Sequence, residues 1–288
     1  MHLVFELPRD RCPICDGSPV TPAYQISAFG AQVGYSICNA CGFIFQNPRL
    51  TAESVRSAYV ADDYWNTAYH EYFKGDRLRM ANSRRRVRFM EQAVGVKAKG
   101  KLLDIGSATG IFAVAARDAG YSVRCIEPSE EIAKIGRDAY GLDFTVSTWE
   151  DAEVEPGSYD AVTLWGTDSH FLDPLPAFRK IAAALRPGGV FAMNYQDFDH
   201  PIRKIFPDLK TGWNVMFNLT GRSIDKIMQL CGLEIVAARM EWPLVSMGAV
   251  LRAVRRPSFP LAERIVLPVP SVSYRAIAAV KIADRHTD

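Results

Sequence analysis

The stretch that decides the fold is Leu102-Leu103-Asp104-Ile105-Gly106-Ser107-Ala108-Thr109-Gly110, an apolar run that ends in small residues before an alanine-rich segment. The run predicts a short buried strand over residues 101–106, and residues 111–119 predict a helix that Gly120 stops. Small residues between a strand and a helix allow a tight turn and a close approach of a ligand to the backbone. The stretch therefore predicts a ligand-binding strand–turn–helix unit.

Two glycine-rich motifs are candidates for this turn. The dinucleotide fingerprint G-x-G-x-x-G fits poorly, because Ala108 stands at its second glycine and Ile111 at its third. The loop resembles more closely the D/E-x-G-x-G-x-G motif of class I S-adenosylmethionine methyltransferases, which Asp104, Gly106 and Gly110 match and Ala108 departs from. Glu127 follows Asp104 by 23 residues at the end of the next predicted strand, where a carboxylate can accept both ribose hydroxyls.

The chain around this loop alternates apolar strands with amphipathic helices, a pattern that predicts an α/β fold with a mostly parallel sheet covered on both faces. Strands are predicted over residues 121–127, 142–147, 159–165, 190–194, 233–240 and 274–282. Helices are predicted over residues 129–140, 173–185 and 220–231, with Ser129 and Thr220 as N-caps. Residues 242–272, rich in Pro, Arg and apolar side chains, form an insertion without a predicted element.

Three later segments extend the resemblance in the right order over residues 99–241. They are the fourth-strand segment Gly157–Trp165, the stretch Ser169-His170-Phe171-Leu172-Asp173-Pro174, in which Ser169 replaces the usual Glu, and the turn Leu185-Arg186-Pro187-Gly188-Gly189-Val190. Together with the loop, they identify the chain as similar to class I S-adenosylmethionine-dependent methyltransferases. The resemblance implies a Rossmann-like seven-stranded sheet and transfer of a methyl group from S-adenosylmethionine.

The resemblance also implies roles for individual residues at the cofactor. The loop residues Asp104, Gly106, Ser107, Ala108 and Gly110 would hold its amino-acid part. Glu127 would hold the ribose, Pro128 and the region of Trp149 would border the adenine, and Trp165 would lie near the methyl donor. For the two tryptophans, plain core packing is the alternative interpretation.

A hydroxyl, amine or acidic carbon acceptor must lose a proton, so a general base is sought at the carboxyl ends of the strands. His170 and Asp168 follow the fourth strand, and Tyr195 follows the fifth, with Asp197 and His200 beyond it. His170 is the preferred candidate for the base. The alternatives are that His170 shapes the loop or contacts the cofactor, and that Asp168 is solvated.

Two cysteine pairs stand near the N-terminus, Cys12-Pro-Ile-Cys15 and Cys38-Asn-Ala-Cys41, with 22 residues between them. This spacing suits one tetrahedral zinc site, and glycines after each pair allow the backbone N–H groups to face the thiolates. Paired disulfides or a redox role are less favoured alternatives. The pattern resembles the zinc-ribbon subgroup of small-molecule and sugar C-methyltransferases. We predict one structural zinc ion, and core positions for Cys125 and Cys231.

These patterns divide the chain into a zinc-ribbon module (1–48), a helical lid or linker (49–98) and a methyltransferase domain (99–288). Within the linker, aromatic residues cluster over 64–73, either as a lid over the site or as a docking contact. Six arginines follow on an amphipathic helix, at positions 77, 79, 84, 85, 86 and 88. They either form a solvated face or bind a phosphate or carboxylate of the acceptor.

Composition limits the function classes. The 288 residues carry a net charge of +2, which excludes a strongly basic nucleic-acid binder. No apolar run is long enough to span a membrane and the first residues do not resemble a signal peptide, so a cytoplasmic location is expected.

The predicted function is methyl transfer to a small-molecule intermediate, possible classes being a sugar nucleotide, a secondary metabolite or a lipid-like acceptor. An RNA-modifying enzyme is an alternative; Gly166-Thr167-Asp168-Ser169, where such enzymes carry Asn/Asp-Pro-Pro-aromatic, speaks against it. A non-enzymatic zinc-ribbon interaction protein is a further alternative, which the intact Asp104 and Glu127 oppose.

Overall fold

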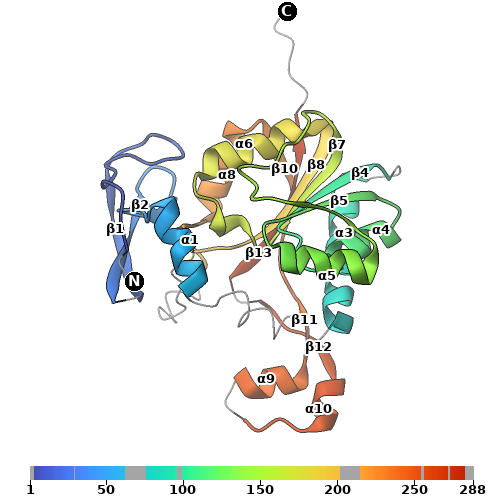
Figure 1. Cartoon of the computed structure of the whole chain (residues 1–288). Helices are drawn as coiled ribbons and strands as arrows, with labels where there is room; N and C mark the ends of the chain where they lie inside the picture. Colours follow the sequence, from blue (N-terminus) through green and yellow to red (C-terminus); the bar gives the residue numbers. More distant parts are fainter. Residues whose placement is uncertain are drawn as a thin grey trace, which may run out of the picture.

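A computed structural model of the chain describes residues 3–28, 30–61, 76–95, 99–201, 215–253, 256–271 and 273–282. A central sheet with helices on both faces is flanked by an N-terminal module on one side and by a small lobe that extends away from the sheet (Figure 1). The aromatic cluster over 64–73, interpreted above as a lid or a docking contact, lies outside the described residues.

The central sheet contains seven strands in the order β10-β13-β8-β7-β4-β5-β6. Their bounds are β4 Lys101–Ile105, β5 Ser122–Glu127, β6 Asp143–Val146, β7 Tyr159–Trp165, β8 Leu185–Gln196, β10 Leu233–Met240 and β13 Tyr274–Lys281. β4 pairs in parallel with both β5 and β7, whereas β13 runs antiparallel to β8 and β10. The predicted α/β fold with a Rossmann-like sheet is confirmed, and its strand order reverses at β4, the point where such sheets bind ligands.

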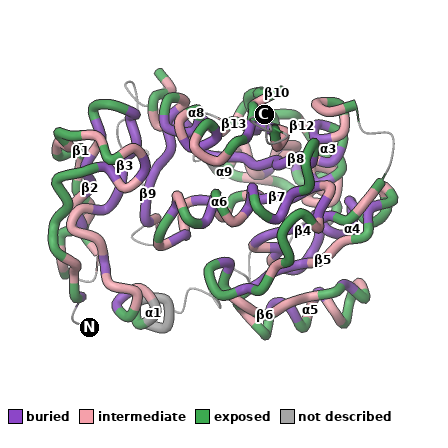
Figure 2. The backbone as a smooth tube through the Cα atoms, turned by 90° about the horizontal axis from the view of Figure 1, so that it is seen from above, coloured by how far each residue is buried: buried purple, intermediate pink, exposed green. Residues whose placement is uncertain are grey.

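The helices form two layers. On one face lie α3 (Asp76–Val94) and α4 (Ile111–Asp118), whose Met90 and Phe112 belong to one buried cluster. On the other face lie α6 (Pro174–Ala184) and α8 (Gly221–Leu230). α5 (Glu130–Tyr140) packs beside β5 and β6. The inner strands β4, β7, β8 and β13 are largely buried, whereas the edge strands β6 and β10 are mostly half-buried or exposed (Figure 2).

The predicted ends of α5 match the structure in physical detail. The Ser129 hydroxyl accepts a hydrogen bond from the Ile132 N–H at 3.3 Å, as an N-cap does. Gly141, with a φ of 62°, ends the helix in the left-handed conformation that glycine adopts without strain.

The N-terminal module is a four-stranded antiparallel sheet in the order β1-β2-β3-β9. β1 (Val20–Ala28), β2 (Ala31–Cys38) and β3 (Ile44–Gln46) come from the first 46 residues and precede α1 (Ala52–Ala61), but β9 (Phe217–Asn218) comes from the segment after β8. The Phe43 and Phe217 rings lie 5.3 Å apart, and the Asn218 amide donates to the Tyr24 hydroxyl at 2.6 Å. The module is therefore completed by a strand that the sequence pattern did not predict.

The insertion before the last strand folds into a small lobe. It contains β11 (Leu244–Ser246), α9 (Met247–Ala253), α10 (Pro260–Arg264) and β12 (Val266–Pro268), with β11 and β12 paired antiparallel. The Asn82 amide of α3 bonds both the N–H and the carbonyl of Leu244, at 2.7 and 3.0 Å. These two bonds fix the lobe to α3. Within the described residues, no helix has the length and apolar character needed to cross a membrane.

Candidate metal centre and cofactor cavity

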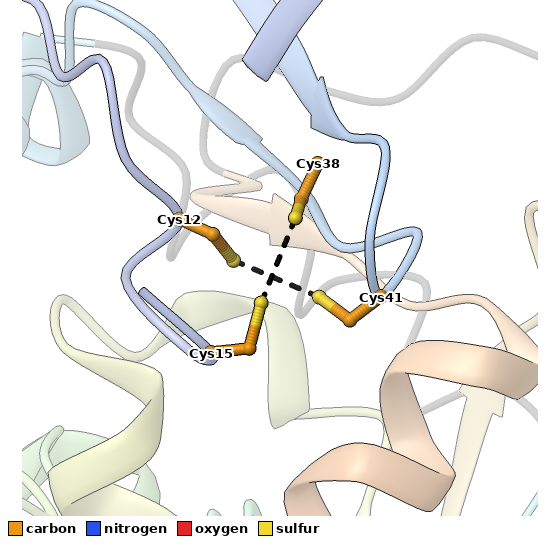
Figure 3. A group of neighbouring side chains, drawn as sticks. All are labelled: Cys12, Cys15, Cys38 and Cys41. Atoms are coloured by element: carbon orange, nitrogen blue, oxygen red, sulfur yellow. Dashed lines mark hydrogen bonds between the residues drawn. The ribbon is translucent and has the colours of Figure 1, made fainter. Parts of the chain in front are cut away.

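The four N-terminal cysteines converge on one point (Figure 3). The sulfur atoms of Cys12 and Cys41 lie 3.7 Å apart, those of Cys15 and Cys38 lie 3.6 Å apart, and all four lie within 4.8 Å of one another. A disulfide would require about 2.05 Å. Tetrahedral zinc with Zn–S bonds of about 2.3 Å places its sulfurs about 3.8 Å apart. The cluster therefore has the donor type and spacing of a four-thiolate zinc site.

The backbone after each pair turns as a metal knuckle requires. Asp16 and Gly42 adopt positive φ angles of 55° and 75°. The Ile14 N–H points at the Cys12 sulfur at 3.4 Å, so the main chain supplies a donor to the thiolate. Cys12, Cys38 and Cys41 are buried and share a hydrophobic cluster with Phe43. The residues present thus fit a structural metal with no open coordination position.

A cavity of about 490 Å³ lies beyond the carboxyl ends of β4 and β7. One wall is the predicted loop, with Asp104, Gly106, Ser107 and Ala108, and Trp165 at the end of β7 adds to it. The opposite wall comes from α3 and from the residues around the end of β10. The volume is within the range of small-molecule sites. The structure therefore brings these four loop residues and Trp165 together in one cavity, whereas Gly110, also predicted to hold the cofactor, is not among the residues that line it.

The loop backbone is left-handed at three positions. Gly106, Ala108 and Gly110 have φ angles of 67°, 48° and 81°. A Cβ atom on Gly106 would lie 2.5 Å from the Thr167 side chain, so this position requires glycine. Ala108 adopts the conformation of the glycine it replaces, at an energetic disadvantage of about 1 kcal/mol. The alanine at this position of the motif thus takes a left-handed conformation that glycine adopts more readily.

Glu127 holds this loop in place. Its carboxylate accepts the Ala108 N–H at 2.9 Å and the Ser129 N–H at 3.1 Å, and the residue is 2% exposed. Burial raises the pKa of Glu127, and these two bonds oppose the shift. Glu127 thus stands beside the loop at the end of β5, although it does not line the cavity that the described residues form.

Asp104 is a buried carboxyl group at the inner end of the cavity. It is 2% exposed, and the Thr163 hydroxyl donates to it at 2.7 Å. Burial raises the pKa of Asp104 to about 7, against the opposing effects of Thr163, Ser107 and the positive charge of Arg86. A group with this pKa changes its protonation near neutral pH.

The raised pKa of Asp104 predicts a stability that falls as pH rises. Between its unfolded pKa of about 4 and its folded pKa of about 7, the folded protein binds more protons than the unfolded chain. The cofactor-free protein should therefore lose about 2 kcal/mol of unfolding free energy between pH 5 and pH 7 through this group. The Asp104→Asn variant keeps an oxygen that accepts from the Thr163 hydroxyl, and it should lose correspondingly less unfolding free energy between the two pH values. Urea unfolding of both proteins at the two pH values measures the difference, and equal losses would contradict the prediction.

A hydrogen-bonded network forms the opposite wall. The Arg86 guanidinium donates two bonds to the Glu241 carboxylate, at 3.1 and 3.4 Å, and lies 4.8 Å above the Trp165 ring. Glu241 also accepts from the Asn194 amide at 2.7 Å, and Asn194 accepts the Gly166 N–H at 2.8 Å. Glu241 and Asn194 were missed by the sequence analysis. The only signal for them was their position at the ends of predicted strands.

Two predicted adenine neighbours do not reach this cavity. The Trp149 indole is buried in the core, donates to the Ala177 carbonyl at 3.0 Å and has Lys180 above its ring. This position agrees with the alternative interpretation of Trp149, that it packs in the core. Pro128 is exposed and follows Glu127 directly.

The three candidate bases also lie outside the cavity formed by the described residues. Tyr195 is 2% exposed in the core on the α6 and α8 side of the sheet, whereas the adjacent Asn194 contacts Glu241 at the cavity wall. Asp168 is buried, and burial raises its pKa to about 7 against hydrogen bonds from its own N–H and that of Ser169. His170 is half-buried in the short helical turn η1 (Asp168–His170). None of the three lines the cavity that the loop shares with Trp165.

A family model described as a methyltransferase domain matches residues 73–238. The ubiquinone biosynthesis O-methyltransferase of Xanthomonas campestris pv. campestris (strain B100) is 33% identical over 100 residues, which cover 33% of this chain and 42% of the relative. The demethylmenaquinone methyltransferase of Paenarthrobacter aurescens (strain TC1) is 28% identical over 137 residues, 47% of this chain and 53% of the relative. The matches thus span about half the length of these relatives.

Solved structures show the same fold at low sequence identity. The protein in complex with the Trm112 methyltransferase activator of Haloferax volcanii aligns with a TM-score of 0.56 at 16% identity, over 81% of this chain and 100% of that one. A SAM-dependent methyltransferase of Thermotoga maritima aligns with a TM-score of 0.52 at 17% identity, over 79% of this chain and 98% of that one. Both likenesses concern the fold alone.

Proposed function

Because the chain belongs to the methyltransferase-domain family, we propose that it transfers a methyl group from S-adenosylmethionine to a small-molecule biosynthetic intermediate. The observation that carries this proposal is the loop of Asp104, Gly106, Ser107 and Ala108, which lines a cavity at the reversal point of the sheet and is anchored by Glu127. The activities named for the curated relatives, in ubiquinone and menaquinone biosynthesis, support an acceptor of small-molecule size.

The loop side of the cavity suits the cofactor in shape and in the groups that it offers. Gly106 and Ala108 leave the loop backbone open to a ligand, and Asp104 offers a carboxylate to a cationic group. The Trp165 indole N–H is buried and, among the described residues, has no hydrogen-bond acceptor, so this wall has an unused donor. S-Adenosylmethionine supplies an activated methyl group on a sulfonium. The contribution of the protein is then to orient the acceptor and to exclude water.

We also propose that Cys12, Cys15, Cys38 and Cys41 hold one structural zinc ion. The thiolate donor set, the sulfur spacing and the burial of the cluster support this assignment. Without an open coordination position, the ion would hold the module together and would take no part in methyl transfer. Elemental analysis of the purified protein should find one zinc per chain; four free thiols without metal would refute the assignment.

Calorimetry with S-adenosylhomocysteine tests the proposed activity. The full-length, zinc-loaded chain should bind one equivalent, and it should not bind NAD, because Ala108 and Ile111 replace two glycines of the dinucleotide motif. Absence of S-adenosylhomocysteine binding would refute methyl transfer by this chain. Binding of NAD in its place would assign the loop to a dinucleotide.

A further inference from the structure

The cavity wall opposite the loop is rich in arginine. Arg79, Arg85 and Arg86 reach it from α3, and Arg239 reaches it from the end of β10. Among the described residues that line the cavity, the only carboxylates are Asp104 and Glu241. Glu241 is already paired with Arg86, and Asp104 is buried behind the loop with its pKa raised to about 7. The cavity therefore has more positive than negative charge.

Arg85 and Arg239 hold the unbalanced charge. Neither guanidinium forms an ion pair with any described residue, whereas Arg86 does. Arg239 is fixed in position, since it donates to the Arg85 carbonyl at 3.3 Å and lies 4.2 Å above the Phe89 ring. Burial and the neighbouring charges of Arg85 and Arg86 lower the pKa of Arg239, against the effect of Glu241. Arg239 is thus held next to the backbone of Arg85, and neither guanidinium is paired with a carboxylate of the described residues.

The cofactor would not neutralise this charge. S-Adenosylmethionine carries a sulfonium and an ammonium against a single carboxylate, so it is a net cation. Its binding would add positive charge to a cavity that already has an excess. Unless the cofactor carboxylate reaches Arg85 and Arg239, the anion that balances them belongs to the other substrate, or the pair stays solvated at the mouth of the cavity.

We propose that the methyl acceptor carries a phosphate or carboxylate group and that Arg85 and Arg239 bind this group at the mouth of the cavity. This inference rests on the proposed function. Guanidinium groups bind both anions through paired, charge-assisted hydrogen bonds, which orient the ligand as well as hold it. An anion held at this wall would leave the rest of the acceptor facing the loop and Trp165, where the methyl donor would lie.

Helix α3, which carries Arg85, also supplies a matched control. Arg88 lies on α3, three residues from Arg85, and is exposed outside the cavity. If the arginines of α3 served only as a solvated face, replacing Arg85 or Arg88 would have the same small effect. If Arg85 binds the acceptor, only its replacement should weaken binding of an anion.

Calorimetry on the full-length, zinc-loaded protein, with and without saturating S-adenosylhomocysteine, provides the test. The titrants are phenyl phosphate, benzoate and, as an uncharged control, benzyl alcohol. We expect one of the two anions to bind and benzyl alcohol not to bind, and this comparison tells a phosphate-bearing from a carboxylate-bearing acceptor. Arg85→Gln and Arg239→Gln should each weaken anion binding about tenfold or more, and Arg88→Gln should change it less than twofold.

Each other outcome has a defined meaning. Binding of neither anion, or equal loss in Arg88→Gln, overturns the acceptor site while leaving the proposed function intact. Loss of S-adenosylhomocysteine affinity in Arg85→Gln and Arg239→Gln with anion binding retained assigns the arginines to the cofactor and also overturns it. A wild-type chain that binds an anion but no S-adenosylhomocysteine refutes the proposed function, and with it the acceptor role of the site.

Discussion

Replacement of Cys38 by Ser is expected to remove the metal and to lower the free energy of unfolding by at least about 3 kcal/mol, or roughly 6–12 °C in the melting temperature. Cys38 is fully buried, and its sulfur lies 3.6 Å from that of Cys15 in the centre of the cluster. Binding of a structural metal contributes directly to folding free energy, and a module of this size has too little core to fold without it.

The loss of stability in Cys38→Ser should extend to the whole chain. Cys12, Cys38 and Cys41 share one hydrophobic cluster with Phe217 and with residues of α6 and α8, so the metal side of the module is continuous with the core of the main domain. Calorimetric unfolding should show a single transition that shifts as a unit. Cys231→Ser, on the partly buried cysteine that follows α8, is the matched control and should shift it little. Equal shifts in the two variants, with zinc retained in both, would contradict the metal assignment.

Replacement of Glu127 by Gln should weaken binding of S-adenosylhomocysteine by about a hundredfold. The carboxylate accepts two backbone N–H groups, from Ala108 and Ser129, whereas a carboxamide has only one oxygen to offer. One N–H would lose its acceptor, and in the role that the resemblance implies for Glu127, one acceptor for the ribose would be lost as well. Each hydrogen bond to a charged group contributes at least about 1.5 kcal/mol, so two losses at this lower end of the range correspond to about two powers of ten in Kd.

Glu130→Gln is the control for this change. Glu130 is an exposed residue at the start of α5 whose partner is Arg137, and it has no contact with the loop. Its replacement removes the same charge close by and should leave the affinity within twofold. If Glu127→Gln also bound S-adenosylhomocysteine as the unaltered protein does, Glu127 would be a structural residue alone. Calorimetry on the two variants and the unaltered protein gives the comparison.

The parts of the fold that depend on local sequence were predictable. The turn after β4, the Ser129 cap and the Gly141 stop follow from the conformations of single residues and their neighbours. The sulfur cluster followed from the spacing of two cysteine pairs. The loop side of the cavity followed from the resemblance, because Asp104 and Gly106 lie close together in the chain.

The remaining wall of the cavity depends on contacts between distant segments. Glu241 meets Arg86 only after β10 and α3 are placed on the sheet, and no periodicity encodes that meeting. The candidate bases illustrate a second limit. The rule that ligands bind at strand ends places Tyr195 near the mouth, but alternate residues of a strand point to opposite faces. Asn194 contacts the cavity wall, and Tyr195 is packed in the core behind the sheet.

The pairing of β9 with β3 has a consequence for synthesis of the chain. The hydrogen bond between Asn218 and Tyr24 joins residues 194 apart, so during synthesis the sheet of β1, β2 and β3 waits for its last strand. At about 5–20 residues per second, that interval is roughly 10–40 s. During this time one edge of β3 is unpaired. Early binding of the metal would keep the four cysteines of the module from reacting with other partners. Of the described parts, the N-terminal module is therefore begun first, but it is completed only after β8 of the central sheet has been made.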